Sequence, residues 1–194
     1  MIDTEKLLKE TYPKFELFSK NKLVLNLLKK LLHEDDCNNV IRENQHLDDY
    51  AFLDKLLHDL NFSYKISAGS LENIPPVGRL LIIANHPIGT LDGLALVQLI
   101  RSIRPDVRIV ANHLLLNVEP LQSVFLPVEV LSDKKNLKDS YKAMMGALRN
   151  EEALIIFPAG EVSRITPIGI RDGEWQTGFI RLAKKTAVLF YLFT

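Results

Sequence analysis

Cysteine is nearly absent from this chain of 194 residues. The single residue, Cys37, cannot form a disulfide within the chain, and zinc sites built from paired thiols are excluded. Acidic residues precede Cys37 in the sequence. Because nearby acids raise the pKa of a thiol, we expect no nucleophilic role for it.

Charge of one sign and long apolar runs are also absent. Lys and Arg together number 24, as do Asp and Glu, so the charge balance indicates no nucleic-acid partner. No apolar run approaches the roughly 20 residues that a membrane-spanning helix needs. The first residues are polar and lack the basic and then apolar regions of a secretory signal, so export is not indicated. Any membrane contact is expected from one side.

The motifs of several enzyme classes are missing as well. Four of the five histidines, His33, His46, His58 and His113, stand at no metal-ligand spacing, so no metal site is predicted. The chain has neither a Gly-x4-Gly-Lys phosphate loop nor a Gly-x-Ser-x-Gly nucleophile elbow. Chemistry that depends on a metal, a bound nucleotide or an acyl-serine therefore loses support.

Residues 1–61 are predicted to form an N-terminal helical segment, because leucines recur at intervals of three and four between charged residues. Residues 20–32 combine a broad apolar stripe with four lysines and no acid. This pattern is typical of a helix that packs on the rest of the protein and also of one that lies on anionic lipid, so both alternatives stay open. A further helix is expected from about residue 48 to residue 60.

Residues 62–194 are predicted to form an α/β domain, with a mixed or mostly parallel sheet covered by helices. Continuous apolar runs are typical of buried strands in such sheets. The expected strands are 80–85, 107–111 and 153–157, and the expected helices are 91–103, 137–149 and 179–185. Ligands of open α/β sheets gather beyond the carboxyl ends of the strands, so the functional residues are expected there.

The first candidate motif, Asn85 to Gly93, follows directly after the strand expected at 80–85. His86 can take a proton from an alcohol, and Asp92 on the other ring nitrogen would fix the tautomer and stabilise the imidazolium. The intervening Pro-Ile-Gly-Thr turn can bring the two side chains together. The alternative is a structural histidine at a strand end, followed by an acid that begins the next helix.

The second candidate motif, Phe157 to Arg164, follows the next buried strand run. Gly160 permits close backbone approach, Glu161 can position a substrate hydroxyl or orient an arginine, and Arg164 can hold a phosphate by a forked contact. The alternative is a surface turn with a solvated ion pair. The polar loop 171–178, which contains the only tryptophan, either flanks a cleft or is an ordinary approach to a helix with Trp175 covering the edge of the core, and the second interpretation is favoured.

Together, the two motifs resemble those of the glycerolipid, or lysophospholipid, acyltransferase family. The resemblance is nearest to a bacterial branch, often labelled hemolysin, that includes acyltransferases making ornithine lipids. It implies His86 as the general base and Asp92 as the residue that orients it. It also implies a lyso-lipid acceptor, a donor that is acyl-CoA or acyl carrier protein, no bound cofactor, and a cytoplasmic position, peripheral on the inner face of the membrane.

The resemblance further implies substrate contacts from Asn85, Gly89, Gly160, Glu161, Ser163 and Arg164. Two departures from the family pattern bear on this. Five residues separate His86 from Asp92, where most of the family has four. In the second motif, Ala159 replaces an acid and Val162 an arginine, so Arg164 becomes the nearest candidate for holding a phosphate.

The third departure is the apolar run at residues 187–193, where the family continues with a proline-containing strand and more chain. We therefore expect a truncated or frameshifted product.

Acyl transfer is the leading hypothesis, with backbone amides around Gly89 or Gly160 expected to stabilise the oxyanion. An inactive lipid-surface binding module and an acyl-thioester hydrolase are the alternatives, and the sequence predicts no oligomeric state.

Overall fold

The computed structural model describes Glu5 and residues 22–31, 34–67, 69, 71–128, 134–167 and 169–193. Within these ranges, one sheet contains the strands β1 (Leu80–Ala84), β2 (Val107–Asn112), β3 (Phe125–Val128), β4 (Ala153–Ile156) and β7 (Phe190–Phe193). The strand order is β3-β2-β4-β1-β7, and every neighbouring pair is parallel. All five carboxyl ends therefore lie at one edge of the sheet, and the prediction of an α/β fold is confirmed.

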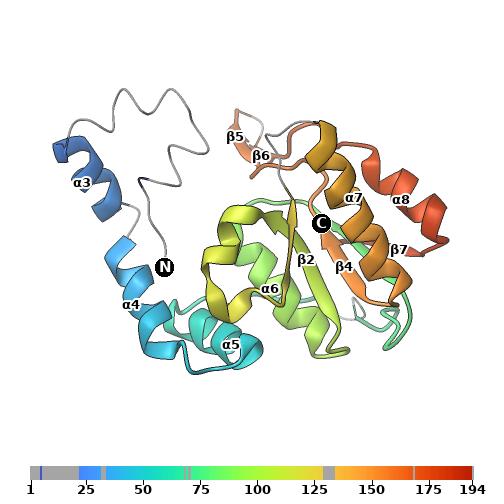
Figure 1. Ribbon diagram of the computed structural model, residues 1–194, viewed down its shortest axis with the longest axis horizontal. Coiled ribbons are helices and arrows are strands. Elements are labelled where there is room, and N and C mark those ends of the chain that lie inside the picture. Colours follow the sequence, from blue (N-terminus) through green and yellow to red (C-terminus); the bar gives the residue numbers. More distant parts are fainter. Residues whose placement is uncertain are drawn as a thin grey trace.

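Helices cover both faces of this sheet (Figure 1). The helices after the N-terminal region are α5 (Asp49–Asp59), α6 (Thr90–Arg101), α7 (Lys134–Arg149) and α8 (Gly178–Thr186). Two short 3-10 helices, η2 (His113–Asn117) and η3 (Glu119–Leu121), link β2 to β3. The predicted helices at 91–103, 137–149 and 179–185 thus each correspond to an observed helix.

The two faces of β1 belong to two different apolar clusters. Leu80, Ile82 and Ala84 pack on the side of α5 and α6, whereas Leu81 and Ile83 pack on the side of α7 and α8. All five residues are buried. This alternation explains why β1 reads as an unbroken apolar run: side chains on both faces are removed from water.

At the amino-terminal ends of the strands, a buried arginine links several of the connections that lead into the sheet. Arg104, with no exposed surface, donates to both carboxylate oxygens of Asp106 at 2.7 Å. It also donates to the backbone oxygens of Pro75 and Glu151. The guanidinium is thereby satisfied, and it joins three connections that precede strands.

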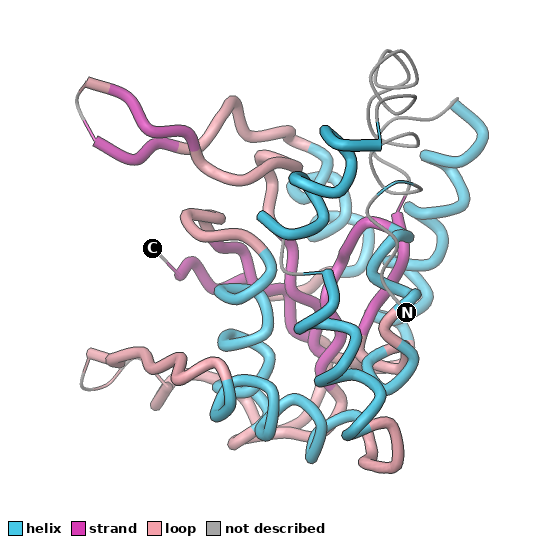
Figure 2. Tube along the Cα trace, turned by 90° about the vertical axis from the view of Figure 1, so that its left-hand side faces the viewer, coloured by secondary structure: helices cyan, strands magenta, loops and turns pink. Residues whose placement is uncertain are grey.

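Two elements have no counterpart among the predicted ones. β3 lies in the proline-containing connection and pairs Pro127 with Ala111. Because β3 is an edge strand, a proline there removes no ladder bond from a second neighbour. A two-stranded antiparallel hairpin, β5 (Arg164–Thr166) and β6 (Gly169–Arg171), follows the second motif and projects from the body of the molecule (Figure 2).

The N-terminal region contains α3 (Lys22–Leu31) and α4 (Glu34–Asn44), which lie beside the sheet domain rather than over the sheet (Figure 1). Most side chains of the stripe predicted at 20–32 fall outside the described residues. Both α4 and α5 contribute to the core, since Ile41 of α4 shares a cluster with Phe52, Leu53 and Leu57 of α5 and with residues of β1 and α6. Among the described helices, none is both long and apolar enough to cross a membrane.

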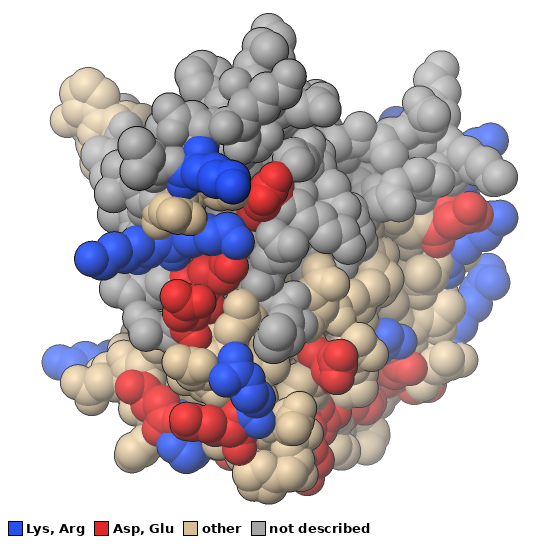
Figure 3. Space-filling view, turned by 60° about the vertical axis from the view of Figure 1, so that its left-hand side comes forward, with Lys and Arg blue, Asp and Glu red and all other residues tan. Residues whose placement is uncertain are grey.

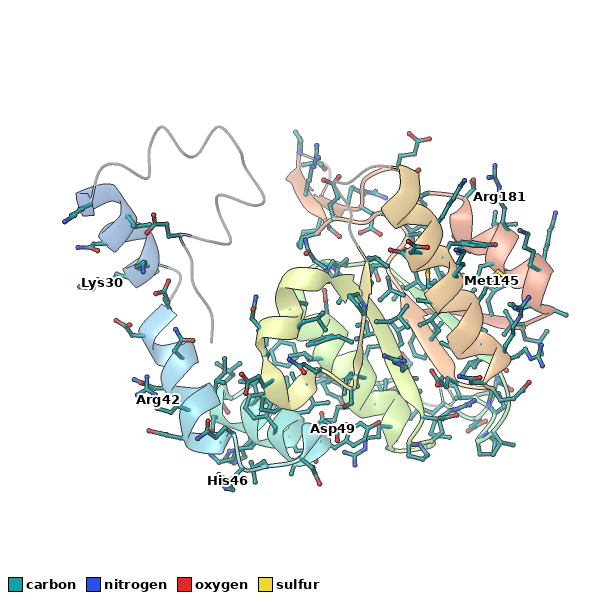
Figure 4. The ribbon with its side chains drawn as sticks, viewed as in Figure 1. Lys30, Arg42, His46, Asp49, Met145 and Arg181 are labelled. Carbon is teal, nitrogen blue, oxygen red and sulfur yellow. The ribbon has the colours of Figure 1, made fainter. Side chains whose placement is uncertain are left out.

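The charged side chains are mixed rather than segregated. On the face shown in Figure 3, Lys and Arg side chains lie beside Asp and Glu side chains. Arg42, in the last turn of α4, and Arg181, on the outer side of α8, are both exposed (Figure 4). Met145 instead packs with the cluster between α7 and α8. This mixed surface agrees with the balanced charge of the whole chain.

Candidate active site

The two motifs meet because the strands that precede them are neighbours. β1 and β4 pair in parallel with Ile83 opposite Ile156, so the residues after each strand emerge side by side. His86 of the first motif then stacks on Phe157 of the second, with ring centroids 4.0 Å apart and planes inclined by 16°. The imidazole is thus held against a flat apolar surface.

The turn after His86 brings Asp92 to its side. Gly89, with a φ of 111°, permits a backbone conformation that other residues rarely adopt, and α6 begins at the next residue. Asp92 lies in the first turn of α6, with its Oδ1 2.8 Å from Nδ1 of His86. Both atoms are buried, and neither has another hydrogen-bond partner among the described residues. Among these residues, Nδ1 of His86 and Oδ1 of Asp92 therefore face only each other.

The second oxygen of Asp92 accepts backbone hydrogen bonds. The amides of Ile88 and Gly89 donate to Oδ2 at 2.8 and 3.3 Å. Burial by itself raises the pKa of Asp92, but the hydrogen bond from His86, these amides and the charge of His86 outweigh it. The pKa therefore lies below its usual value, and the carboxylate remains charged where the imidazole must be oriented.

Close packing beneath the His86–Asp92 dyad leaves no room for a side chain at Gly93. A Cβ there would lie 3.0 Å from Cδ1 of Ile109 and 3.3 Å from Cε2 of Phe157. Phe157 is the ring on which His86 stacks. The glycine therefore lets α6 approach the sheet closely enough to place Asp92 beside His86.

An apolar cavity of about 230 Å³ lies beside the pair. Asp92 and two residues that flank His86 line one part of it, and Phe157 lines another. The remaining lining is largely apolar and comes from α6, the strand ends and the segment after α5: Phe62, Tyr64, Ala84, Ile88, Ala95, Leu96, Leu99 and Phe193. A narrow apolar ligand fits this lining better than a polar one.

Comparison with known proteins agrees with this geometry. A family model described as acyltransferase matches residues 7–190. This chain belongs to the acyltransferase family. The prediction from the two motifs is thereby confirmed.

Two curated relatives of this acyltransferase are lyso-glycine lipid O-acyltransferases. The protein from Bacteroides thetaiotaomicron is 32% identical over 181 residues, which cover 93% of this chain and 65% of the relative. The protein from Phocaeicola vulgatus is 28% identical over 188 residues, which cover 96% of this chain and 65% of the relative. The chain therefore spans slightly less than two thirds of the length of each.

The residues predicted to contact substrate divide into two groups in this acyltransferase. Asn85 lines the cavity, Gly89 binds Asp92, and Ser163 donates its backbone N–H to the carbonyl of His86 at 2.7 Å. These three lie at the dyad. The other group, Glu161 and Arg164 with Gly160, lies on an exposed turn.

On that turn, Nη2 of Arg164 is 2.8 Å from Oε2 of Glu161, and 72% of the arginine side chain is exposed. The ion pair raises the pKa of Arg164. Both the functional interpretation and the solvated ion pair predicted a charged turn here. The observed contact has the geometry of the solvated ion pair, and a role of Glu161 and Arg164 in substrate binding stays a prediction.

The expected oxyanion donors are engaged elsewhere. The amide of Gly89 donates to Asp92 at 3.3 Å, and the amide of Gly160 donates to the carbonyl of Phe157 at 3.0 Å. Each of these two N–H groups therefore has a partner within the protein, and a role of the amides around Gly89 or Gly160 in stabilising an oxyanion stays a prediction.

One residue that contacts His86 was not among the site residues predicted from the sequence. Asp172, in the loop interpreted as an ordinary helix approach, accepts a hydrogen bond from the backbone N–H of His86 at 3.3 Å. The two residues are 86 positions apart. No local pattern signals this contact, because it depends on which strands are neighbours. Among the described residues, no group of three or more side chains is arranged to hold a metal.

Proposed function

We propose that this acyltransferase moves a fatty-acyl group from an acyl thioester to a hydroxyl of a lyso-lipid acceptor. The observation that carries the proposal is a largely buried His86–Asp92 pair beside an apolar cavity. The pair supplies a base for a hydroxyl, and the cavity suits an acyl chain. The names of the two relatives, both O-acyltransferases acting on a lyso-lipid, favour a hydroxyl acceptor.

In the proposed reaction, Nε2 of His86 takes the proton of the acceptor hydroxyl while Nδ1 stays bonded to Asp92. The acceptor oxygen attacks the thioester carbonyl, and a tetrahedral oxyanion forms. When this intermediate collapses, the C–S bond breaks and the leaving thiolate takes the proton back from His86. Asp92 holds the tautomer and stabilises the imidazolium throughout, and no acyl-enzyme is formed.

The donor in this proposal is acyl-CoA or acyl carrier protein, and no bound cofactor is needed. The acceptor is embedded in a membrane, so the protein works at a membrane surface, peripheral to the inner face of the cytoplasmic membrane. Asn85, Ser163 and Arg164 are proposed to contact the substrates. Asn85 is supported by its place in the cavity lining.

The test is an incubation of the protein with labelled acyl-CoA or acyl carrier protein and a panel of lyso-lipids that includes lyso-glycine lipid. The wild type is expected to form acylated product, and His86→Ala is expected to form none. His58→Ala is the matched control, because the side chain of His58 is 85% exposed and, within the described part of the chain, pairs with Asp59 alone. It should keep wild-type activity.

Two results would contradict acyl transfer, and a third would contradict only the role of His86. Release of free fatty acid at the same rate with and without acceptor would identify a thioester hydrolase instead. Binding to lipid vesicles without turnover of any donor would identify a lipid-surface module. Acylated product from His86→Ala at the wild-type rate would exclude the dyad mechanism.

A further inference from the structure

Both backbone polar groups of His86 are held by one distant segment. The N–H of His86 donates to Oδ1 of Asp172 at 3.3 Å, and its carbonyl accepts from the N–H of Ser163 at 2.7 Å. His86 lies past the end of β1, where the strand ladder no longer supplies partners. Without residues 163–172, these two groups would have no partner in the protein.

Asp172 is the centre of this arrangement. Its Oδ1 also accepts from the hydroxyl of Ser163, and its Oδ2 accepts from Nε1 of Trp175 at 2.8 Å. One carboxylate therefore joins the backbone of His86, the second motif and the loop that leads to α8. On the far side of the same loop, the N–H of Gln176 donates to the carbonyl of Pro158 at 3.0 Å. The segment is thus fastened at both ends.

The charge of Asp172 is maintained by its donors. Burial raises its pKa, but the hydrogen bonds from Ser163, Trp175 and the backbone of His86, with the charge of His86, bring the pKa below its usual value. A charged acceptor forms stronger hydrogen bonds than a neutral one. The three donors are therefore held more tightly than a neutral side chain would hold them.

We propose that Asp172 is a positioning residue, which fixes the backbone of His86 so that the imidazole stays in line with Asp92. The inference rests on the proposed function, because it gives Asp172 a part in the same reaction. Asp172 holds the strand end from which the imidazole projects, and Asp92 holds the ring. The loop 171–178, which reads as an ordinary approach to a helix, thereby becomes part of the site.

The experiment compares Asp172→Ala, Asp172→Asn and the control Asp139→Ala by steady-state kinetics and by NMR of protein labelled with ¹⁵N-histidine. Asp139 is exposed on α7 and pairs with Lys142. The signals of His86 are assigned by their loss in His86→Gln. Thermal unfolding shows whether each variant is folded.

We expect Asp172→Ala to lower kcat by about 10-fold to 100-fold, since a displacement of about 1 Å at a reacting group costs up to that much. The KM for the acceptor should change little, and the His86 ring signals should shift. Asp172→Asn keeps an oxygen for His86 and Ser163 but turns its NH2 group toward the N–H of Trp175, so it should recover only part of kcat. Asp139→Ala should match the wild type in both measurements.

The inference is overturned if folded Asp172→Ala keeps wild-type kcat and wild-type His86 signals, or if only KM rises. If Asp172→Ala fails to fold, Asp172→Asn is the test. Its His86 NMR signals are expected to shift, by a smaller amount than in Asp172→Ala. Unshifted His86 signals in Asp172→Asn would then overturn the inference. If the wild type transfers no acyl group, the proposed function fails, while the NMR comparison still tests whether Asp172 positions the imidazole.

Discussion

Asp92→Asn tests the dyad sharply, because the structure determines which way the new amide must point. The backbone amides of Ile88 and Gly89 converge on the same oxygen, Oδ2, at 2.8 and 3.3 Å. The single oxygen of the asparagine must take that position, since an NH2 group there would face two donors. The NH2 group then faces Nδ1 of His86, where Oδ1 of the aspartate stood at 2.8 Å.

This orientation changes the tautomer of His86. With a donor opposite, Nδ1 must accept a hydrogen bond, so the neutral ring carries its proton on Nε2. Nε2 can then no longer take a proton from a hydroxyl. The equivalent Asp-to-Asn change in a serine protease triad lowers kcat about 10⁴-fold, and we expect a loss of about 10³-fold to 10⁴-fold here.

The fold should survive the change. The three contacts of the carboxylate, with His86, Ile88 and Gly89, become neutral, a difference of about 1 kcal/mol each. In a chain of this size, each 1 kcal/mol corresponds to a fall in Tm of about 2–4 °C. Activity is measured as labelled acyl transfer to a lyso-lipid and stability by thermal unfolding, with Asp139→Asn as the control. If Asp92→Asn kept more than a tenth of wild-type kcat, the tautomer argument would be wrong.

Three further predictions concern packing, the cavity and pH. Gly93→Ala should lower the free energy of unfolding by about 1–3 kcal/mol through overpacking. Gly146→Ala, where a Cβ meets no atom within 4 Å, should raise the free energy of unfolding by about 0.5–1 kcal/mol. Urea titration measures both, and equal effects would refute the close approach of α6 to the sheet at Gly93. Ala95→Leu should fill part of the cavity and lower activity on long acyl chains by about 10-fold relative to short ones. The control Ala143→Leu, at an exposed position of α7, should leave this chain-length profile unchanged. An unchanged profile in Ala95→Leu would place the acyl chain elsewhere. Hydrogen bonds from a buried arginine hold the pKa of Asp106 below its usual value, so Asp106→Asn should destabilise the fold at pH 7. That loss should persist above the unfolded pKa of about 3.9 and vanish as pH falls through the lower folded value; a loss independent of pH would contradict it.

The sequence predicted those parts of the fold that local patterns govern. β1 and β4 were expected within a residue or so, because strands buried on both faces produce unbroken apolar runs. α6 was expected because its apolar residues recur with helical spacing and an acid begins it. The hydrogen bond partner of His86 within its own motif, Asp92, was also expected, since only a short turn separates them.

Features that depend on strand order or on weak local patterns were missed. β3 has four residues and contains Pro127, so it resembles a connection. The β5–β6 hairpin has three residues in each strand, too few to show an alternating pattern. The contact between Asp172 and His86 joins residues 86 positions apart, and no local pattern in either segment indicates it.

The pairing of β1 has a consequence for synthesis on the ribosome. Leu80 pairs with Ala153, and Leu81 pairs with Phe190, so both neighbours of β1 are made long after it. At roughly 5–20 residues per second, β1 waits for several seconds with both edges open. During that interval an unbroken apolar strand is exposed to other nascent chains, and a chaperone that binds extended apolar segments would protect the strand that precedes the catalytic histidine.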